Sequence, residues 1–177
     1  MRIKLPDPSL VVLIGPAGSG KSTFAARHFR PTQILSSDAF RAMVADDEAD
    51  QSATSAAFSL LHAVARQRLA RGKLTVVDAT SVEPRARAPL VALAKRYDIP
   101  VVAVVFDVPY DLNLDWNAYR SRRTVDVAVI ERHRQAMVGV VDGLAAEGFD
   151  AHWVLDSVEV IDRIEILRSM RRNPVPG

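Results

Sequence analysis

The sequence contains no cysteine among its 177 residues, which excludes disulfide bonds, thiolate metal ligands and a cysteine nucleophile. It has no apolar run that reaches the roughly 18 residues of a membrane-spanning helix. Its first residues also lack the continuous apolar stretch of a secretory signal. We therefore expect a cytoplasmic protein with no membrane partner, in which any catalysis rests on groups other than thiols.

The chain carries little net charge, +2, although 19 of its basic residues are Arg and only 4 are Lys. Arginine favours bidentate phosphate contacts, but a GC-rich genome would produce the same usage, so the charge alone leaves a nucleic-acid partner open. With 49% hydrophobic and 25% charged residues, the composition is typical of one folded domain. We expect this domain over residues 1–170, followed by a proline-containing tail at 171–177 that is a flexible end or a linker.

Short apolar runs rich in β-branched residues recur along the chain, each bounded by turn residues. Because they are nearly continuous rather than alternating, they are typical of parallel strands buried on both faces by helices. Segments of helical period lie between them, which predicts an α/β layered domain with right-handed crossovers. The predicted strands are 10–14, 33–36, 74–77, 101–106 and 152–155, and the predicted helices are 22–29, 53–70, 84–96, 112–119, 125–147 and 158–170.

A glycine-rich motif separates the first predicted strand from a helix. Residues 15–22 match G-x-x-x-x-G-K-[ST] in full, in the strand-to-helix setting that phosphate binding requires. The glycines let successive backbone N–H groups face the phosphates of ATP or GTP, and the helix adds the positive end of its dipole. Lys21 is expected to reach the β- and γ-phosphates, and the Ser22 hydroxyl to ligate Mg²⁺. The predicted nucleotide contacts here are Gly15, Pro16, Ala17, Gly18, Ser19, Gly20, Lys21, Ser22 and Thr23.

Together, the motif and the alternation of strand and helix predict an α/β fold of the P-loop NTPase type. We expect a three-layer sandwich with a central parallel sheet of about five strands, helices on both faces and a helical lid.

Two strand-end aspartates and an arginine cluster are candidates for the chemistry. Asp38 follows the second predicted strand and could accept the proton of an attacking hydroxyl, or could instead cap the next helix. Asp78 ends the third strand and could hold Mg²⁺ or its waters, or could be a solvated strand-end residue. The arginines within residues 120–123 could form a lid over the nucleotide, or could be a solvated helix end.

Four stretches of the sequence carry a family resemblance. Residues 15–24, 34–41, 44–54 and 72–80 resemble the kinase module of bacterial polynucleotide kinase-phosphatases, and the similarity covers about residues 8–165. The resemblance implies transfer of the γ-phosphate of ATP to a 5′-hydroxyl end of DNA or RNA. In a longer chain, phosphatase or ligase domains would be partners.

The resemblance also implies roles for individual residues. Asp38 would be the general base and Arg41 would contact the acceptor, whose path Gln51 and Thr80 would line. The remaining implied residues are Arg120 and Arg123 in the lid and Asp156 and Ser157 near the adenine.

Two positions depart from the family pattern. Trp116 stands where the family usually has its first lid arginine, and Ser81 stands where it often has asparagine. Trp116 could be a packing residue or a platform on which a nucleobase stacks. The leading hypothesis is thus a polynucleotide 5′-hydroxyl kinase that uses ATP and Mg²⁺. The alternatives are a kinase of a small-molecule hydroxyl (metabolite, nucleoside or antibiotic) and an ATP-binding module without catalysis.

Overall fold

The computed structural model describes residues 1–119 and 124–170. Its centre is a five-stranded parallel sheet with the order β3-β4-β2-β5-β6, which confirms the predicted fold class. The phosphate-binding motif follows the central strand of this sheet. The strands are β2 (Leu10–Ile14), β3 (Ile34–Ser36), β4 (Thr75–Asp78), β5 (Val101–Phe106) and β6 (Ala151–Leu155).

Both faces of the sheet are buried, as the continuous apolar runs predict. Every residue of β2 is fully buried, and its alternate side chains enter two different cores. Leu10, Val12 and Ile14 belong to one core, whereas Val11 and Leu13 belong to the other. A strand that serves two cores cannot alternate between apolar and polar residues, which explains its sequence.

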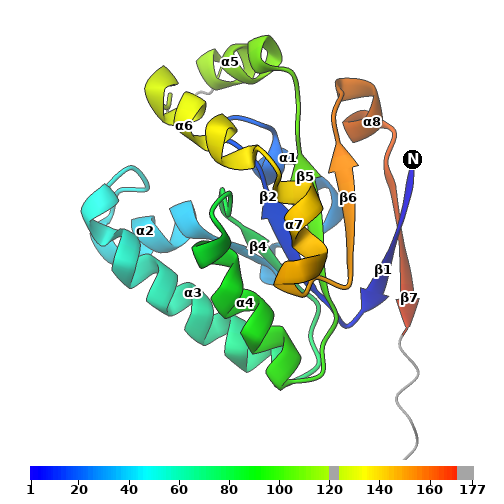
Figure 1. Cartoon of the computed structure of the whole chain (residues 1–177). Helices are drawn as coiled ribbons and strands as arrows, with labels where there is room; N and C mark the ends of the chain where they lie inside the picture. The colour runs from blue at the N-terminus through cyan, green and yellow to red at the C-terminus, as the bar shows by residue number, and fades with distance from the viewer. Residues whose placement is uncertain (120–123, 171–177) are drawn as a thin grey trace, which may run out of the picture.

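Helices cover both faces and the end of the sheet at which the strands terminate (Figure 1). One core is formed with α3, α4 and α7, and the other with α1, α8 and a small second sheet. Helices α5 and α6 lie across the end toward which β6 points. The helices are α1 (Lys21–His28), α2 (Ser37–Ala45), α3 (Thr54–Leu69), α4 (Pro84–Arg96), α5 (Tyr110–Ala118), α6 (Val127–Met137), α7 (Val140–Glu147) and α8 (Val158–Asp162), with single 3-10 turns at Pro31–Gln33 and Gln51–Ala53.

The prediction of one helix over residues 125–147 was wrong. The segment forms α6 and α7, which are separated at Gly139, whose φ of 73° lies in the left-handed region. A glycine adopts this conformation without steric cost, so the chain changes direction there.

The prediction of a closing helix over residues 158–170 was also wrong. Only α8 is helical, and two residues after it the chain forms strand β7 (Glu165–Met170), which pairs in parallel with β1 (Arg2–Asp7). Figure 1 shows the two strands side by side at one edge of the molecule. Because β7 finds its partner at the other end of the chain, its local sequence is a poor guide to its structure. Within the described ranges, no helix is both long and apolar enough to cross a lipid bilayer.

Candidate active site

The phosphate-binding loop joins the end of β2 to the start of α1. Gly18 and Gly20 have φ values of 81° and 88°, and Gly20 is the residue before the first turn of α1. A residue with a side chain would be strained at either position. The loop therefore curls just ahead of α1, whose first turn carries the positive end of the helix dipole and suits an anionic ligand.

A cavity of about 610 Å³ lies beside this loop, at the end of the sheet covered by α5 and α6. It brings together residues that are far apart in the sequence. The predicted site residues that line it are Ala17, Gly18, Ser19, Gly20, Lys21, Ser22, Thr23, Asp38, Arg41, Gln51, Asp78 and Thr80.

Six predicted site residues are not among those that line the cavity. Gly15 and Pro16 directly precede the part of the loop that does. Asp156 and Ser157 do not line the cavity, although Val158 and Ile161 from the same region do. Ser157 instead caps α8, where its hydroxyl accepts a hydrogen bond from the Val160 N–H at 3.4 Å. Arg120 and Arg123 lie outside the described residues, as does the tail at 171–177.

The Lys21 side chain is buried against the loop that precedes it. Its Nζ donates to the carbonyl oxygen of Gly15 at 2.9 Å and to that of Pro16, and it lies 3.2 Å from the Ser19 hydroxyl. These contacts explain the places of Gly15 and Pro16, which support the ammonium group. Phosphate oxygens are acceptors of the same kind, so the residues present fit the triphosphate of a nucleotide.

The corner between β3 and α2 holds Asp38 and Arg41. Ser36 caps α2 by accepting from the Ala39 N–H at 3.4 Å, so the alternative that Asp38 is the cap was wrong. Asp38 lies in the first turn and forms an ion pair with Arg41, whose side chain is only 8% exposed. The Arg41 Nε also donates to the Glu48 carbonyl at 2.9 Å. One buried guanidinium thus connects the candidate base to the loop at residues 46–50 that follows α2.

Asp78 ends β4 directly beside the end of β3, in register with Ser36. It is only 6% exposed, so the alternative of a solvated strand-end aspartate was wrong. Two residues on, the Thr80 carbonyl accepts from the Gly15 N–H at 3.0 Å, which joins this strand end to the phosphate-binding loop. Mg²⁺ commonly takes one or two protein ligands together with phosphate oxygens and water. The Ser22 hydroxyl and the Asp78 carboxylate, which line one cavity, fit that requirement.

Helices α5 and α6, referred to below as the lid helices, each have a residue that contacts the loop and was missed in the sequence. Asn113 of α5 is fully buried, and its Nδ2 donates to the Ala17 carbonyl at 2.7 Å. His133 of α6 lines the cavity, and its Nδ1 accepts from the Ala17 N–H at 3.3 Å. Neither residue belongs to a motif, so their role is visible only once the helices are packed on the loop.

Trp116 of α5 also packs against the phosphate-binding loop. A Cβ atom at Gly20 would be 3.0 Å from the Trp116 Cζ3, so the indole ring covers this glycine closely. The ring lines the cavity as well. Trp116 thus packs against Gly20 and also faces the cavity, and stacking on a bound base stays a prediction.

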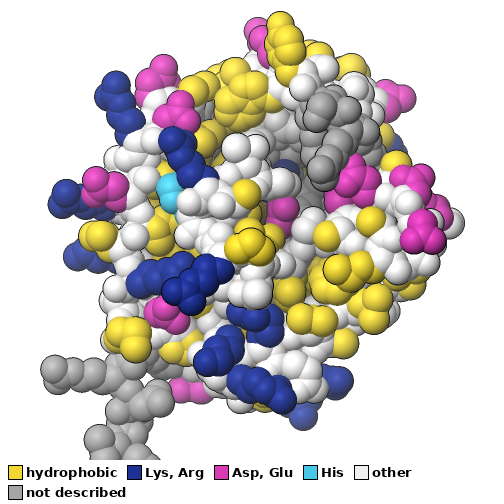
Figure 2. Space-filling model, turned by 180° about the vertical axis from the view of Figure 1, so that it is seen from behind, with side chains coloured by type: hydrophobic (Ala, Val, Ile, Leu, Met, Phe, Trp, Pro, Cys, Tyr) yellow, Lys and Arg dark blue, Asp and Glu magenta, His cyan; other side chains and the backbone are white. Residues whose placement is uncertain are grey.

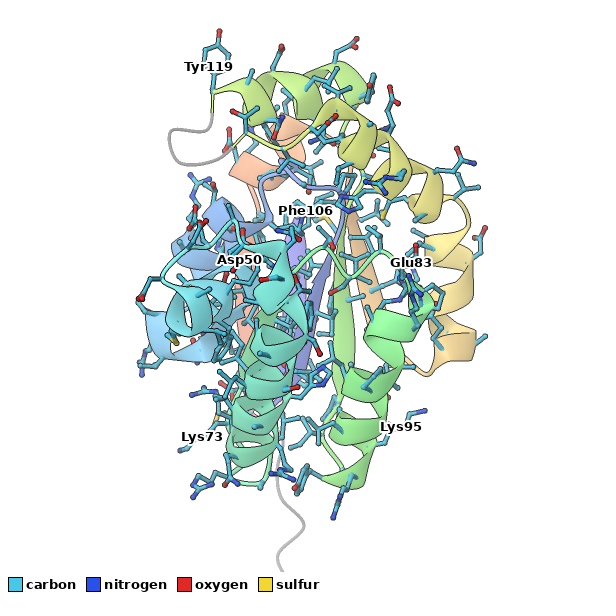
Figure 3. All side chains as sticks on the ribbon, turned by 90° about the vertical axis from the view of Figure 1, so that its left-hand side faces the viewer. Asp50, Lys73, Glu83, Lys95, Phe106 and Tyr119 are labelled. Atoms are coloured by element: carbon cyan, nitrogen blue, oxygen red, sulfur yellow. The ribbon has the colours of Figure 1, made fainter. Side chains whose placement is uncertain are left out.

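A second hollow lies at the opposite end of the molecule. Arg30, Arg68, Arg71 and Lys73 line it, and Figure 3 shows Lys73 at the end away from Tyr119, which lines the active-site cavity. Arg68 is held by the Thr75 hydroxyl and the Leu74 carbonyl. Seen from behind, Lys and Arg side chains gather over the lower part of the surface, whereas Asp and Glu side chains are more frequent at the upper right (Figure 2). Most of the predicted site residues line the cavity beside the phosphate-binding loop and not this second hollow.

Comparison with solved structures identifies the same fold in several kinases. A protein described as a candidate kinase from Chloroflexus aurantiacus has 16% identity and a TM-score of 0.61, with 85% of each chain covered. A sugar kinase from Janibacter has 17% identity and a TM-score of 0.56, with 84% of this chain and 85% of that chain covered. A chain of the Pnkp1/Rnl/Hen1 RNA repair complex has 24% identity and a TM-score of 0.64, with 78% of this chain but only 46% of that chain covered.

The sequence comparison agrees with the fold. A search of curated protein sequences returns no match. A family model described as an AAA domain matches residues 10–144, which contain the phosphate-binding loop, Asp38, Asp78 and both lid helices. The chain therefore belongs to this AAA domain family, and its fold is shared with several kinases.

Proposed function

We propose that the protein transfers the γ-phosphate of ATP to the 5′-hydroxyl end of DNA or RNA. The observation that carries the proposal is the pairing of Asp38 with Arg41 in the cavity that also holds Lys21. A carboxylate, a guanidinium and an ammonium group thereby share one space. Transfer onto a hydroxyl needs this combination, because a proton must be removed while phosphate charge is neutralised.

In the proposed reaction, the 5′-oxygen forms a bond to the γ-phosphorus as the bond from that phosphorus to the β–γ bridging oxygen breaks. Asp38 accepts the proton of the attacking hydroxyl, and ADP leaves with the bridging oxygen. Lys21 and the loop N–H groups offset the negative charge on the phosphates. Ser22 and Asp78 would hold Mg²⁺, which supplies further charge neutralisation when bound. Arg120 and Arg123, which lie outside the described residues, would contribute lid cations.

The similarity to a chain of an RNA repair complex supports a polynucleotide acceptor. The present chain spans less than half of that chain. We accordingly propose that residues 1–170 form the kinase domain and residues 171–177 a tail or linker. Phosphatase or ligase domains in a longer protein, and a cytoplasmic location, belong to the same proposal.

The test is transfer of label from radiolabelled ATP with Mg²⁺ to 5′-hydroxyl oligonucleotides of DNA and RNA, with 5′-phosphorylated oligonucleotides as blanks. We expect label on the 5′-hydroxyl strands only. Asp38→Asn should lower the rate by about 100-fold or more while ATP binding is retained, since a general base contributes about 10²- to 10⁴-fold. Asp46→Asn is the matched control, because Asp46 is exposed and its positive φ suits asparagine.

Label on no oligonucleotide, under conditions in which ATP binds, would refute the polynucleotide acceptor. ATP binding without turnover, unchanged in Asp38→Asn, would instead indicate a binding module.

A second candidate is transfer to a small-molecule hydroxyl. It is favoured by the similarity to a sugar kinase over most of both chains and by Trp116, which replaces the expected lid cation with an apolar ring in the cavity. ATP consumption in the presence of pooled metabolites separates the two candidates. The leading proposal predicts stimulation by polymer ends, whereas this one predicts stimulation by a metabolite in the pool.

A further inference from the structure

Ala17, near the tip of the phosphate-binding loop, has both of its backbone polar groups bound to side chains from the lid helices. Its carbonyl accepts from the Asn113 Nδ2 of α5 at 2.7 Å. Its N–H donates to the His133 Nδ1 of α6 at 3.3 Å. Two helices therefore hold one residue of the loop from two directions, although the loop precedes them by 96 and 116 residues.

The end of α5 is also bonded to the segment that leads into α6. The Asn117 Nδ2 donates to the Val125 carbonyl at 2.8 Å, and the Val125 N–H donates to the Asn117 Oδ1 at 3.0 Å. Both residues are buried. Because these bonds tie the end of α5 to the segment before α6, we expect a displacement of either helix to affect the bonds at Ala17.

We propose that Asn113 and His133 are positioning residues for phosphoryl transfer. Together they fix the position of the phosphate-binding loop relative to α5 and α6. This inference rests on the proposed transfer function. Neither residue takes part in the chemistry. Each acts through Ala17 on the loop that places Lys21 and the backbone N–H groups.

The charge state of His133 matters, because Nδ1 can accept from an N–H only while it is unprotonated. Burial lowers the pKa of His133 below its ordinary value, and the positive charges of Lys21 and Arg132 lower it further, against an opposing effect of Glu83. The ring is therefore neutral at pH 7. In the neutral ring, the remaining proton is on Nε2.

Loss of the hydrogen bonds from Asn113 and His133 to Ala17 should lower the rate of transfer more than the affinity for ATP. ATP is bound by several loop N–H groups and Lys21, so one shifted residue removes little affinity. Transfer depends on the alignment of the reacting atoms, and a misplacement of about 1 Å can cost about 100-fold. The expected signature is a lower kcat with a nearly unchanged dissociation constant for ATP.

The test compares three substitutions on α6, with transfer to 5′-hydroxyl oligonucleotides and ATP binding measured separately. His133→Leu, which removes the acceptor, should lower kcat by about 10- to 100-fold. His133→Asn keeps an acceptor at the position of Nδ1 and does not titrate. It should restore kcat to within about threefold of the original chain and should shift the acid limb of the pH profile. Gln135→Leu, an exposed substitution on the same helix, is the control and should change nothing.

Wild-type kcat in His133→Leu would overturn the inference. So would equal losses of kcat, ATP affinity and thermal stability in both His133 variants, because such losses indicate a purely structural residue. On α5, Asn113→Asp places a second acceptor opposite the Ala17 carbonyl and should repeat the kcat loss of His133→Leu.

A spectroscopic measurement separates failure of this inference from failure of the proposed function. In ¹⁵N NMR spectra, His133 should show a protonated Nε2 and an unprotonated Nδ1, and the Ala17 amide resonance should move as His133 titrates. Both features are independent of any acceptor. An Nδ1-protonated ring, or an Ala17 resonance that ignores the titration, overturns the inference even if transfer is observed. If both features are present but no oligonucleotide is labelled, the proposed function fails while the contact stands.

Discussion

In helix α2, the guanidinium of Arg41 forms an ion pair with the carboxylate of Asp38 one turn earlier. The guanidinium is nearly buried, whereas the carboxylate is about one-third exposed, at 36%. Asp38, the candidate base, is thus paired with a buried cation, and its carboxylate remains open to the cavity. Since Arg41 also binds the Glu48 carbonyl at 2.9 Å, the orientation of Asp38 depends on the loop after α2.

We predict that Arg41→Lys lowers the transfer rate by about 10- to 100-fold without changing ATP affinity. A lysine has no planar fork and cannot bind Asp38 and the Glu48 carbonyl together. A hydrogen bond to a charged group contributes about 1.5–3 kcal/mol, which corresponds to this range in rate. Steady-state kinetics and ATP titration check the prediction. Arg2→Lys, in an exposed pair with Glu165, is the control, and a full rate in Arg41→Lys would contradict the prediction.

Trp116 should report nucleotide binding by fluorescence. The chain has two tryptophans, and only Trp116 lines the cavity, whereas Trp153 packs against the second core. In a Trp153→Phe variant, addition of ATP should therefore change the emission of Trp116 in a saturable way. In a Trp116→Phe variant, the emission of Trp153 should stay nearly constant. Saturable binding by calorimetry with constant Trp116 emission would place the nucleotide away from this ring.

Gly20→Ala should impair both folding and nucleotide binding. A left-handed conformation costs a residue with a side chain roughly 1–2 kcal/mol, and the new Cβ would also lie 3.0 Å from the Trp116 ring. Gly72→Ala is the matched control, because Gly72 has a positive φ but nothing within 4 Å of the added atom. Urea unfolding should show a larger loss for Gly20→Ala than for Gly72→Ala, with weakened ATP binding only in the former. Equal losses would show that the contact with Trp116 is unimportant.

Arg87 and Glu147 form a buried ion pair that supports the loop after β4. The Arg87 side chain is 1% exposed, and its Nη1 also donates to the carbonyls of Ser81 and Val82 at 2.9 and 2.7 Å. Glu147→Gln leaves this guanidinium without its counter-charge, so we expect a loss of about 3–5 kcal/mol in the free energy of unfolding.

The matched control for this pair is Glu165→Gln, which breaks the exposed pair with Arg2, whose side chain is 73% exposed. It should cost less than about 1 kcal/mol. Chemical denaturation measures both variants. Similar losses in the free energy of unfolding for the two variants would mean that the buried pair stabilises the fold no more than the exposed pair.

The free energy of unfolding should fall as the pH falls below about 6.5, the ordinary pKa of histidine. Burial lowers the pKa values of His28, His62 and His133 in the folded chain. The unfolded chain therefore binds more protons, so stability is full above pH 6.5 and is lost as the pH falls through the lowered pKa values. His62→Leu, on α3 and outside the cavity lining, should make denaturation curves less dependent on pH between 7 and 5. An unchanged dependence would exclude His62 as a contributor.

The parts of the fold that depend on local pattern were predicted closely. Strands β2 and β5 and helix α4 have the predicted bounds. The two strands are continuous apolar runs, and the helix has an apolar face of helical period, so each signal lies within one segment. The misassigned end at 158–170 forms a strand only because β1, at the far end of the chain, pairs with it. Gly139 breaks the predicted helix at 125–147 through a backbone conformation, which a count of apolar residues does not detect.

The sequence by itself determined the nucleotide-binding loop, because the glycines, Lys21 and Ser22 act within one short segment between a strand and a helix. It also placed Asp38 and Asp78 at strand ends, where parallel strands bring such residues to one edge. Only the tertiary structure decided that Ser36 rather than Asp38 caps α2, that Trp116 packs on Gly20, and that Asn113 and His133 hold Ala17. These relationships depend on how helices pack over the loop, and a hydrogen bond across 116 residues leaves no local pattern in the chain.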